Sequence, residues 1–211
     1  MKKKILLPTD FSDNAWSAAV YALNLFENYK CTFYFLNALS PQTPVPEYDS
    51  GKAIDVQKEL AELKDMAITA NANVDHEIET IASQYNLKKA VETAVNRFDI
   101  DLVVMGTKGA SGVEEVFMGS NAVRVIKSVK DCPILAIPNS YKFTRPKEIA
   151  FATDFNRFYT KSELKPLVDM AKSLGAVVRI VHVQYEIKAL SELQQFNLGM
   201  LRKYLTDVEH Y

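Results

Sequence analysis

The sequence predicts an α/β protein with an open, doubly wound parallel sheet of five strands, followed by a partial second copy of the same fold. Two observations lead to this prediction. Short apolar runs alternate with amphipathic stretches from residue 3 onward, which is typical of βαβ units and a parallel sheet. The chain also repeats itself, because the segment 149–155 (IAFATDF) matches the segment 5–11 (ILLPTDF). Such internal similarity indicates a duplicated architecture.

Length and composition set the limits of this prediction. The chain has 211 residues, of which 48% are hydrophobic and 24% are charged, and its formal net charge is −1. The length suits one full domain with something extra. The charge balance argues against a nucleic-acid partner, and no apolar run approaches the roughly 20 residues of a membrane-spanning helix. We therefore expect no nucleic acid and no membrane among the partners.

The chain has only two cysteines, Cys31 and Cys132, which lie far apart in the sequence. This pattern fits a reducing compartment better than a disulfide scaffold. The basic residues 2–4 precede an apolar run that is too short for the core of a signal peptide. The expected location is the cytoplasm. The histidines His76 and His210 are isolated from other ligand-type residues, so no metal site is expected.

The first half of the chain predicts alternating strands and helices. The helix that follows the first strand can be capped by Ser12 or Asp13, and it carries Ala15, Ala19 and Ala22 on one face. In order, the expected elements are a strand at 5–7, this first helix, a strand at 32–37, a proline-containing loop at 40–51, a helix over about 53–72 and an edge strand near 74–80.

The next elements complete one domain over residues 1–140. The clearest helix covers 87–98, where apolar residues recur with the helical period. A strand at 102–105 is apolar throughout, as expected for a strand that is buried on both faces. A helix that begins at Ser120 as its N-cap and a last strand at 133–137 follow.

Residues 145–211 predict the partial second domain. The segment 174–183 parallels 29–38, the amphipathic segment 187–205 matches the second helix, and 207–211 would open the third strand. Asp154 matches Asp10, and His182 stands where Asn37 does. Because no glycine loop follows in this copy, we expect Asp154 to be a structural cap and His182 to be a strand-end residue rather than a ligand.

A glycine-containing loop follows the strand at 102–105. Gly106, Gly109 and Gly119 precede Ser120 at the start of a helix, and Lys108 adds a positive charge. Glycines permit close backbone approach to a ligand, and free amides at a helix start attract anions. The loop therefore suits phosphate. It is not a Walker A loop, and the alternative is that the glycines serve only as a tight connection.

These residues resemble the universal stress protein family, whose nucleotide-binding members carry Gly-x2-Gly-x9-Gly followed by Ser or Thr. The resemblance covers 3–138 as a full unit, with Pro8-Thr9-Asp10 after the first strand, and continues over 147–211 as a partial second unit. It implies the sheet order 3-2-1-4-5 of adenine nucleotide alpha hydrolase-like folds. Ligands of such sheets lie beyond the carboxyl ends of the strands, at the switch between the first and fourth strands.

The resemblance also implies a set of cofactor-binding residues for ATP. Asp10 would meet the adenine edge, and Pro8, Thr9 and Ala38 would surround the base. Met105 and Gly106 would lie under the ribose. The phosphates would be met by the remaining members of the set, which are Lys108, Gly109, Gly119, Ser120, Asn121 and Ala122. Other adenine nucleotides, and a Mg²⁺ ion with the phosphates, stay open.

This sequence departs from the family pattern at three positions. Lys108 stands where Arg or His is common, and Asn121 and Ala122 replace a frequent β-branched and hydroxyl pair. The departures bear on affinity and on the number of phosphates bound. Asp10 also has a purely structural alternative, since Asp often caps a helix or closes a turn.

Three functions are open at this point. The first is a universal stress protein that binds ATP in stress response or signalling, which the sequence favours. The second is a slow ATP hydrolase, although Ser111, Glu114 and Glu115 of the loop form no recognisable catalytic arrangement for phosphoryl transfer. No catalytic residue is therefore assigned. The third is a dimerisation scaffold that binds no nucleotide. In the resembling family the fifth strands pair across a dimer, which predicts a homodimer through strand 133–137.

Overall fold

The computed structural model describes residues 2–38, 55–70, 73–108, 118–139, 141–184, 186 and 188–211. The chain divides into two compact units, Met1–Phe143 and Thr144–Tyr211. In the parts of the chain that are described, no helix has the length and apolar character needed to cross a membrane.

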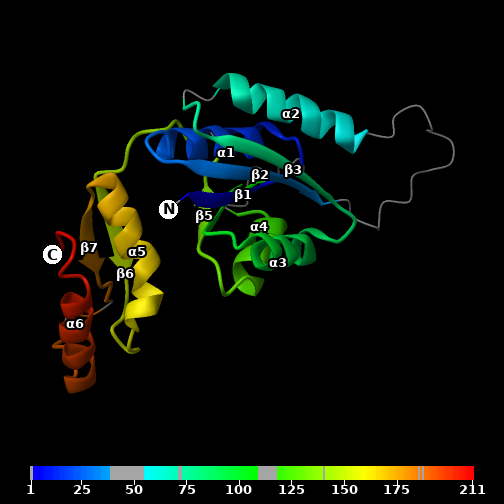
Figure 1. The fold of residues 1–211 in the computed structure, drawn as a ribbon. Helices are drawn as coiled ribbons and strands as arrows, with labels where there is room; N and C mark the ends of the chain where they lie inside the picture. Colours follow the sequence, from blue (N-terminus) through cyan, green and yellow to red (C-terminus); the bar gives the residue numbers. More distant parts are fainter. Residues whose placement is uncertain are drawn as a thin grey trace. The chain divides into compact units, whose positions relative to one another are not determined.

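The first unit is a five-stranded parallel sheet with the predicted order β3-β2-β1-β4-β5. Helices α1 and α2 cover one face of the sheet, and α3 and α4 cover the other (Figure 1). Its elements are β1 (Lys3–Thr9), α1 (Asp13–Leu25), β2 (Cys31–Ala38), α2 (Val56–Ala70), β3 (Glu77–Ser83), α3 (Leu87–Phe98), β4 (Leu102–Gly106), α4 (Ser120–Ser128) and β5 (Ile134–Ile137).

The two central strands are buried on both faces. In β1, Leu6 packs in one core cluster with Val91 of α3 and Val125 of α4. Its neighbours Ile5 and Leu7 are also buried, and they point to the opposite face because side chains alternate along a strand. The apolar run at residues 5–7 of β1 and the all-apolar β4 therefore correspond to the centre of a doubly covered sheet.

The strand expected near 74–80 is shifted in the structure, where β3 begins only at Glu77. Residues 73–76 form a turn instead. The side-chain oxygen of Asn73 accepts a hydrogen bond from the backbone N–H of Asp75 at 2.9 Å, and the N–H of His76 donates to the carbonyl of Asn73 at 3.1 Å. Asparagine favours such turns because its side chain bonds the backbone two residues on. The expected edge position of this strand is confirmed.

The second unit contains β6 (Glu148–Ala152), α5 (Lys161–Leu174), β7 (Val177–Val181) and α6 (Glu192–Tyr204). Strands β6 and β7 pair in parallel. The last residues described continue this sheet, because the N–H of Val178 donates to the carbonyl of Glu209 at 2.9 Å and the N–H of Tyr211 donates to the carbonyl of Val178 at 3.1 Å. Residues 209–211 therefore pair with β7 through an isolated parallel bridge, at the place where the match between the two copies predicts a third strand.

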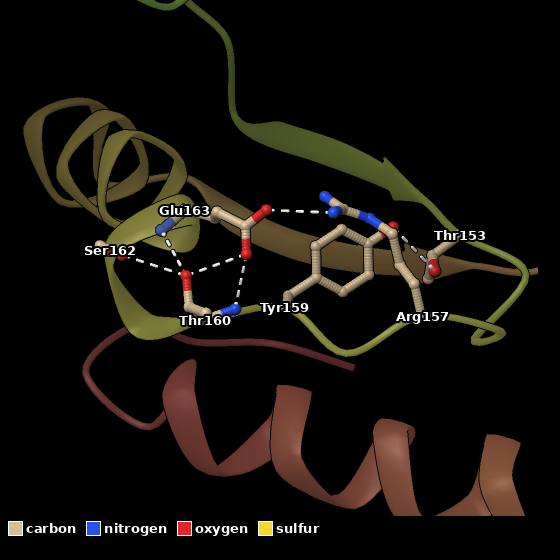
Figure 2. Close-up of polar contacts among 6 residues, drawn as sticks. All are labelled: Thr153, Arg157, Tyr159, Thr160, Ser162 and Glu163. Atoms are coloured by element: carbon tan, nitrogen blue, oxygen red, sulfur yellow. Dashed lines mark hydrogen bonds and ion pairs between the residues drawn. The ribbon is translucent and has the colours of Figure 1, made fainter. Parts of the chain in front are cut away.

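A capping box fixes the start of α5 (Figure 2). The Thr160 hydroxyl accepts a hydrogen bond from the backbone N–H of Glu163 at 3.2 Å, and the Glu163 carboxylate accepts one from the N–H of Thr160 at 2.8 Å. Arg157 donates to the same carboxylate at 3.0 Å and lies over the ring of Tyr159. The backbone and hydroxyl of Thr160, and then Arg157, hold the pKa of Glu163 below its ordinary value. The connection between strand and helix is longer here than between β1 and α1.

The surroundings of the His76 imidazole make its protonation unfavourable in the folded protein. Its ring packs edge-on against Phe33 with the ring centroids 5.0 Å apart, and neither ring nitrogen has a hydrogen-bond partner within the described chain. Burial lowers the pKa of His76 below its ordinary value, and the nearby Asp75 opposes this shift. The folded protein therefore favours the neutral ring.

We predict that His76 makes the protein less stable in acid. Because its pKa is lower in the folded than in the unfolded chain, its contribution is complete above the ordinary histidine pKa of about 6.5 and is lost as the pH falls through the folded-state value. Urea unfolding between pH 5 and 8 should show a smaller loss of stability in His76→Leu than in the unmodified protein. Parallel stability curves for the two proteins would show that the histidine does not titrate on unfolding.

Candidate functional site

A solvent-open pocket of about 140 Å³ lies at the carboxyl ends of β1, β2 and β4. This is the edge where neighbouring strands β1 and β4 leave the sheet in different directions, and open parallel sheets bind ligands there. The pocket is lined by Pro8, Thr9, Asp10, Ala15, Asn37, Ala38, Leu87, Met105, Gly106, Thr107, Lys108, Gly119, Ser120, Asn121 and Ala122.

Eleven of the twelve residues assigned from the resemblance thus line one pocket, although they come from four separate stretches of the sequence. The twelfth, Gly109, lies outside the described residues, as do Ser111, Glu114 and Glu115 of the loop. The sequence assignment omitted four of the lining residues, which are Ala15, Asn37, Leu87 and Thr107. Asn37 and Thr107 lie at or just after strand ends, and Ala15 and Leu87 lie in the first turns of helices at the same edge; these positions are the signal that the sequence offers.

A tight turn after β1 presents Asp10. Phe11 adopts a left-handed backbone conformation with φ of 62°, and its N–H donates to the Thr9 hydroxyl at 3.0 Å. The Asp10 carboxylate accepts hydrogen bonds from the N–H and hydroxyl of Ser12, at 3.2 and 2.5 Å. Ser12 in turn caps α1 by accepting from the N–H of Ala15 at 3.3 Å. The structural role of Asp10 is therefore real, and its exposed side chain also lines the pocket.

Asn37 ties the ends of β1 and β2 together. Its side-chain amide donates to the backbone carbonyl of Thr9 at 2.9 Å, and both residues are almost fully buried. This bond holds the backbone beside Asp10 in register with the end of β2, where Ala38 follows. Asn37 is thus a supporting residue of the pocket wall.

Glycine is required at the end of β4 by close packing. A Cβ atom at Gly106 would lie 2.5 Å from Nδ2 and 2.8 Å from Cγ of Asn14. The same Nδ2 donates to the backbone carbonyl of Lys108 at 2.5 Å. The first glycine of the motif therefore makes room for a side chain of α1 rather than for a positive φ.

Helix α4 begins one residue earlier than the sequence indicates. Gly119 is the N-cap, with φ −64° and ψ 152°, and Ser120 is the first helical residue. The prediction of Ser120 as the N-cap is wrong. Because glycine has no side chain, the N-cap residue makes no side-chain hydrogen bond to the first-turn amides of α4, and the first turn carries no acidic residue. These amides, with the positive end of the helix dipole, are a candidate anion site.

The pocket combines an anion site with apolar walls and a carboxylate. Lys108 and the start of α4 favour negative charge, whereas Pro8, Ala38 and Met105 offer apolar surface. Asp10 is the single carboxylate among the described lining residues, and the described chain holds no group of three or more His, Cys, Asp or Glu residues that could bind a metal. A small anion with a polar planar group matches this lining.

The second unit repeats the turn but has no described counterpart of this anion site. Phe155 has φ 57° and its N–H donates to the Thr153 hydroxyl at 3.1 Å, and the Asp154 carboxylate accepts from the N–H of Asn156 at 2.9 Å. This bond is the largest cause of the lowered pKa of Asp154. His182 takes the place of Asn37, with Nδ1 2.9 Å from the carbonyl of Thr153. The turn therefore forms without a glycine loop.

The fold and the pocket define an open parallel α/β protein with a pocket at the strand edge between β1 and β4. The model of the universal stress protein family matches residues 1–138. The chain therefore belongs to the universal stress protein family.

Two relatives support this assignment, and one solved structure shares the fold. A universal stress protein of Methanocaldococcus jannaschii is 32% identical over 149 residues, which cover 66% of this chain and 84% of the relative. One from Thermus aquaticus is 30% identical over 141 residues, covering 65% of this chain and 99% of the relative. A solved universal stress protein of Archaeoglobus fulgidus shares the fold over 99% of this chain and 74% of its own, with a TM-score of 0.61 and 17% identity.

We predict that Gly106→Ala damages both the pocket and the stability of the first unit. The added methyl group would overlap the Asn14 amide, and such overpacking typically costs about 1–3 kcal/mol. Urea unfolding should show this loss. The matched control is Gly199→Ala in α6, where an added Cβ meets no atom within 4 Å and helix propensity favours alanine. Equal stability of the Gly106→Ala and unmodified proteins would mean that Asn14 can move away at no cost.

Proposed function

We propose that the first unit binds an adenine nucleotide, ATP in the first place, in the pocket at the ends of β1 and β4. The observation that carries this proposal is the shared pocket of Asp10, Lys108 and the uncapped start of α4. A hydrogen-bonding carboxylate and an anion site at one strand edge match the two chemically different ends of a nucleotide. Membership of the universal stress protein family supports the same proposal.

The base would lie against the apolar part of the lining. Pro8 is the last but one residue of β1, Ala38 ends the neighbouring β2, and Leu87 begins α3 at the same edge. Flat apolar surface suits a purine ring, and small-molecule sites combine such surface with a few polar groups that set orientation. The Asp10 carboxylate can accept a hydrogen bond from an exocyclic amino group. This hydrogen bond distinguishes adenine from guanine, because position 6 of the purine ring carries an amino group in adenine and a carbonyl in guanine.

The phosphates would lie at the start of α4. The amides of Ser120, Asn121 and Ala122 belong to its first turn, and Lys108 supplies a full positive charge near them. Charge-assisted hydrogen bonds to phosphate are stronger than neutral ones. Asn121 carries a side-chain amide where the family more often has a β-branched residue. Of these residues, Asn121 is therefore the one whose side chain could change the number of phosphates that bind.

We favour reversible binding over hydrolysis. Phosphoryl transfer needs a group that orients the attacking water and ligands for Mg²⁺, and Asp10, the single carboxylate among the described lining residues, is proposed to meet the base rather than the phosphates. The function that follows is nucleotide sensing in stress response or signalling. Slow ATP hydrolysis is the alternative, which a steady-state assay of phosphate release decides.

The nucleotide proposal predicts a phosphate-dependent loss of affinity in Lys108→Gln. Removing the charge should weaken ATP binding about tenfold, as expected for a charge-assisted bond of about 1.5–3 kcal/mol, while adenosine binding changes little. Isothermal titration calorimetry with both ligands measures this difference. The control is Lys127→Gln in the last turn of α4. If the unmodified protein neither releases nucleotide on denaturation nor binds millimolar ATP, the scaffold alternative takes its place.

We also propose that the first unit forms a homodimer through β5. Strand β5 lies at one edge of the sheet, and Ile134, Leu135 and Ala136 are only partly buried there. The carbonyl of Pro133 accepts from Val103 of β4, and that of Ile137 accepts from Thr107 directly after β4. By the two-residue period of a strand, the backbone groups of Ile134 and Ala136 point away from β4, toward a pairing partner.

The dimer proposal predicts that Ala136→Pro yields a monomer. Proline removes the outward N–H at this edge position but leaves the bonds to β4 intact, and edge strands tolerate it there. Sedimentation equilibrium at several protein concentrations measures the mass, and Ala136→Val, which keeps the N–H, is the control. A monomeric mass for the unmodified protein would contradict the proposal directly.

A further inference from the structure

We propose that Asn14 is a positioning residue of the nucleotide site, which fixes the first peptide of the glycine loop for phosphate binding. The phosphate part of this inference rests on the proposed function. Asn14 is the second residue of α1 and does not line the pocket. Its only route to the ligand is therefore through the backbone that it holds.

The contacts of Asn14 converge on the end of β4. Its side chain is 6% exposed and lies so close to Gly106 that a Cβ there would be 2.5 Å from Nδ2. Nδ2 donates to the carbonyl of Lys108, 94 residues further along the chain, at 2.5 Å. A helix of one βα unit is thus bonded to the backbone that opens the loop of another.

Three hydrogen bonds hold the backbone at the two ends of this loop. The N–H of Thr107 donates to the carbonyl of Ile137 at 2.9 Å, and the N–H of Gly119 donates to the carbonyl of Thr107 at 2.6 Å. The third is the bond from Asn14 to Lys108. Of the three, only this one uses a side chain, so it is the one that a substitution can remove.

An asparagine at this position carries costs for folding. Its Oδ1 atom is buried and has no hydrogen-bond partner within the described chain, and a buried acceptor without a donor is unfavourable. The start of α1 is already capped by Ser12. Asparagine is also a poorer helix former than alanine. The group that offsets these costs is the amide N–H₂ on the Lys108 carbonyl.

The carbonyl that Asn14 bonds belongs to Lys108, the residue whose side chain is proposed to meet the phosphates. Fixing it limits the backbone at Lys108, and through the Thr107 to Gly119 bond it limits the start of α4 as well. A site that is held in its binding geometry before the ligand arrives loses less conformational freedom on binding. Asn14 should therefore affect affinity for phosphates and leave affinity for the base unchanged.

The test compares Asn14→Ala with Asn24→Ala in two measurements. Asn24 is the matched control, because its side-chain amide, like that of Asn14, donates to a backbone carbonyl. The acceptor is Val20 of α1 at 2.9 Å, which does not line the pocket. The first measurement is the ratio of ATP to adenosine affinity by calorimetry. The second, which needs no nucleotide, is hydrogen exchange of the Gly119 amide by NMR. Asn14→Ser, which keeps a small polar group, replaces Asn14→Ala if the latter does not fold.

We expect the affinity ratio to fall about tenfold and the Gly119 amide to exchange about tenfold faster in Asn14→Ala, as for the loss of one buried hydrogen bond. Both should stay unchanged in Asn24→Ala. Unchanged values in both Asn14 variants, with tight ATP binding in the unmodified protein, would overturn the role of Asn14 and leave the proposed function standing. Faster Gly119 exchange in a protein that binds no ATP would uphold the positioning role at the loop and overturn the nucleotide function.

Discussion

Parallel pairing of β1 with β4 is the constraint on which the first unit depends. The register that places Ile5 beside Leu102 and Leu6 beside Val103 brings two strands from distant parts of the chain to the centre of the sheet. Both strands are buried on their two faces. A shift of either strand by one residue would move each of its side chains to the opposite face and disrupt the packing there. With this register, the segments after Thr9 and Gly106 must leave the sheet at one edge, where they form the pocket.

Comparison of the two units distinguishes the structural role of the turn after the first strand from the features found only at the pocket. Thr9-Asp10-Phe11 and Thr153-Asp154-Phe155 build the same turn, with the same hydroxyl bond and the same left-handed phenylalanine. A carboxylate at this position is therefore explained by the backbone alone. The first unit differs at the end of the neighbouring strand. There Gly106 leaves room for the Asn14 side chain, and α4 begins at a glycine N-cap.

Much of this arrangement could be predicted from residue patterns. Buried strands such as β4 have an all-apolar sequence, and the spacing of Gly106, Gly109 and Gly119 predicts a phosphate loop at the edge where the pocket lies. The errors are local: β3 starts later than 74 because Asn73 closes a turn, and Gly119 replaces Ser120 as the cap of α4. Asn14 was missed because an asparagine in the first turn of a helix looks like part of a cap.

The sequence by itself determined the order and type of the elements, the duplication and the candidate residues, since these depend on periodicity and on spacing along the chain. Only the tertiary structure decided which partners those residues meet. Asn14 and Lys108 are 94 positions apart, and Thr9 and Asn37 are 28 apart. No local pattern specifies such pairs, because their contact arises from strand order and register, which are set by burial of the whole sheet.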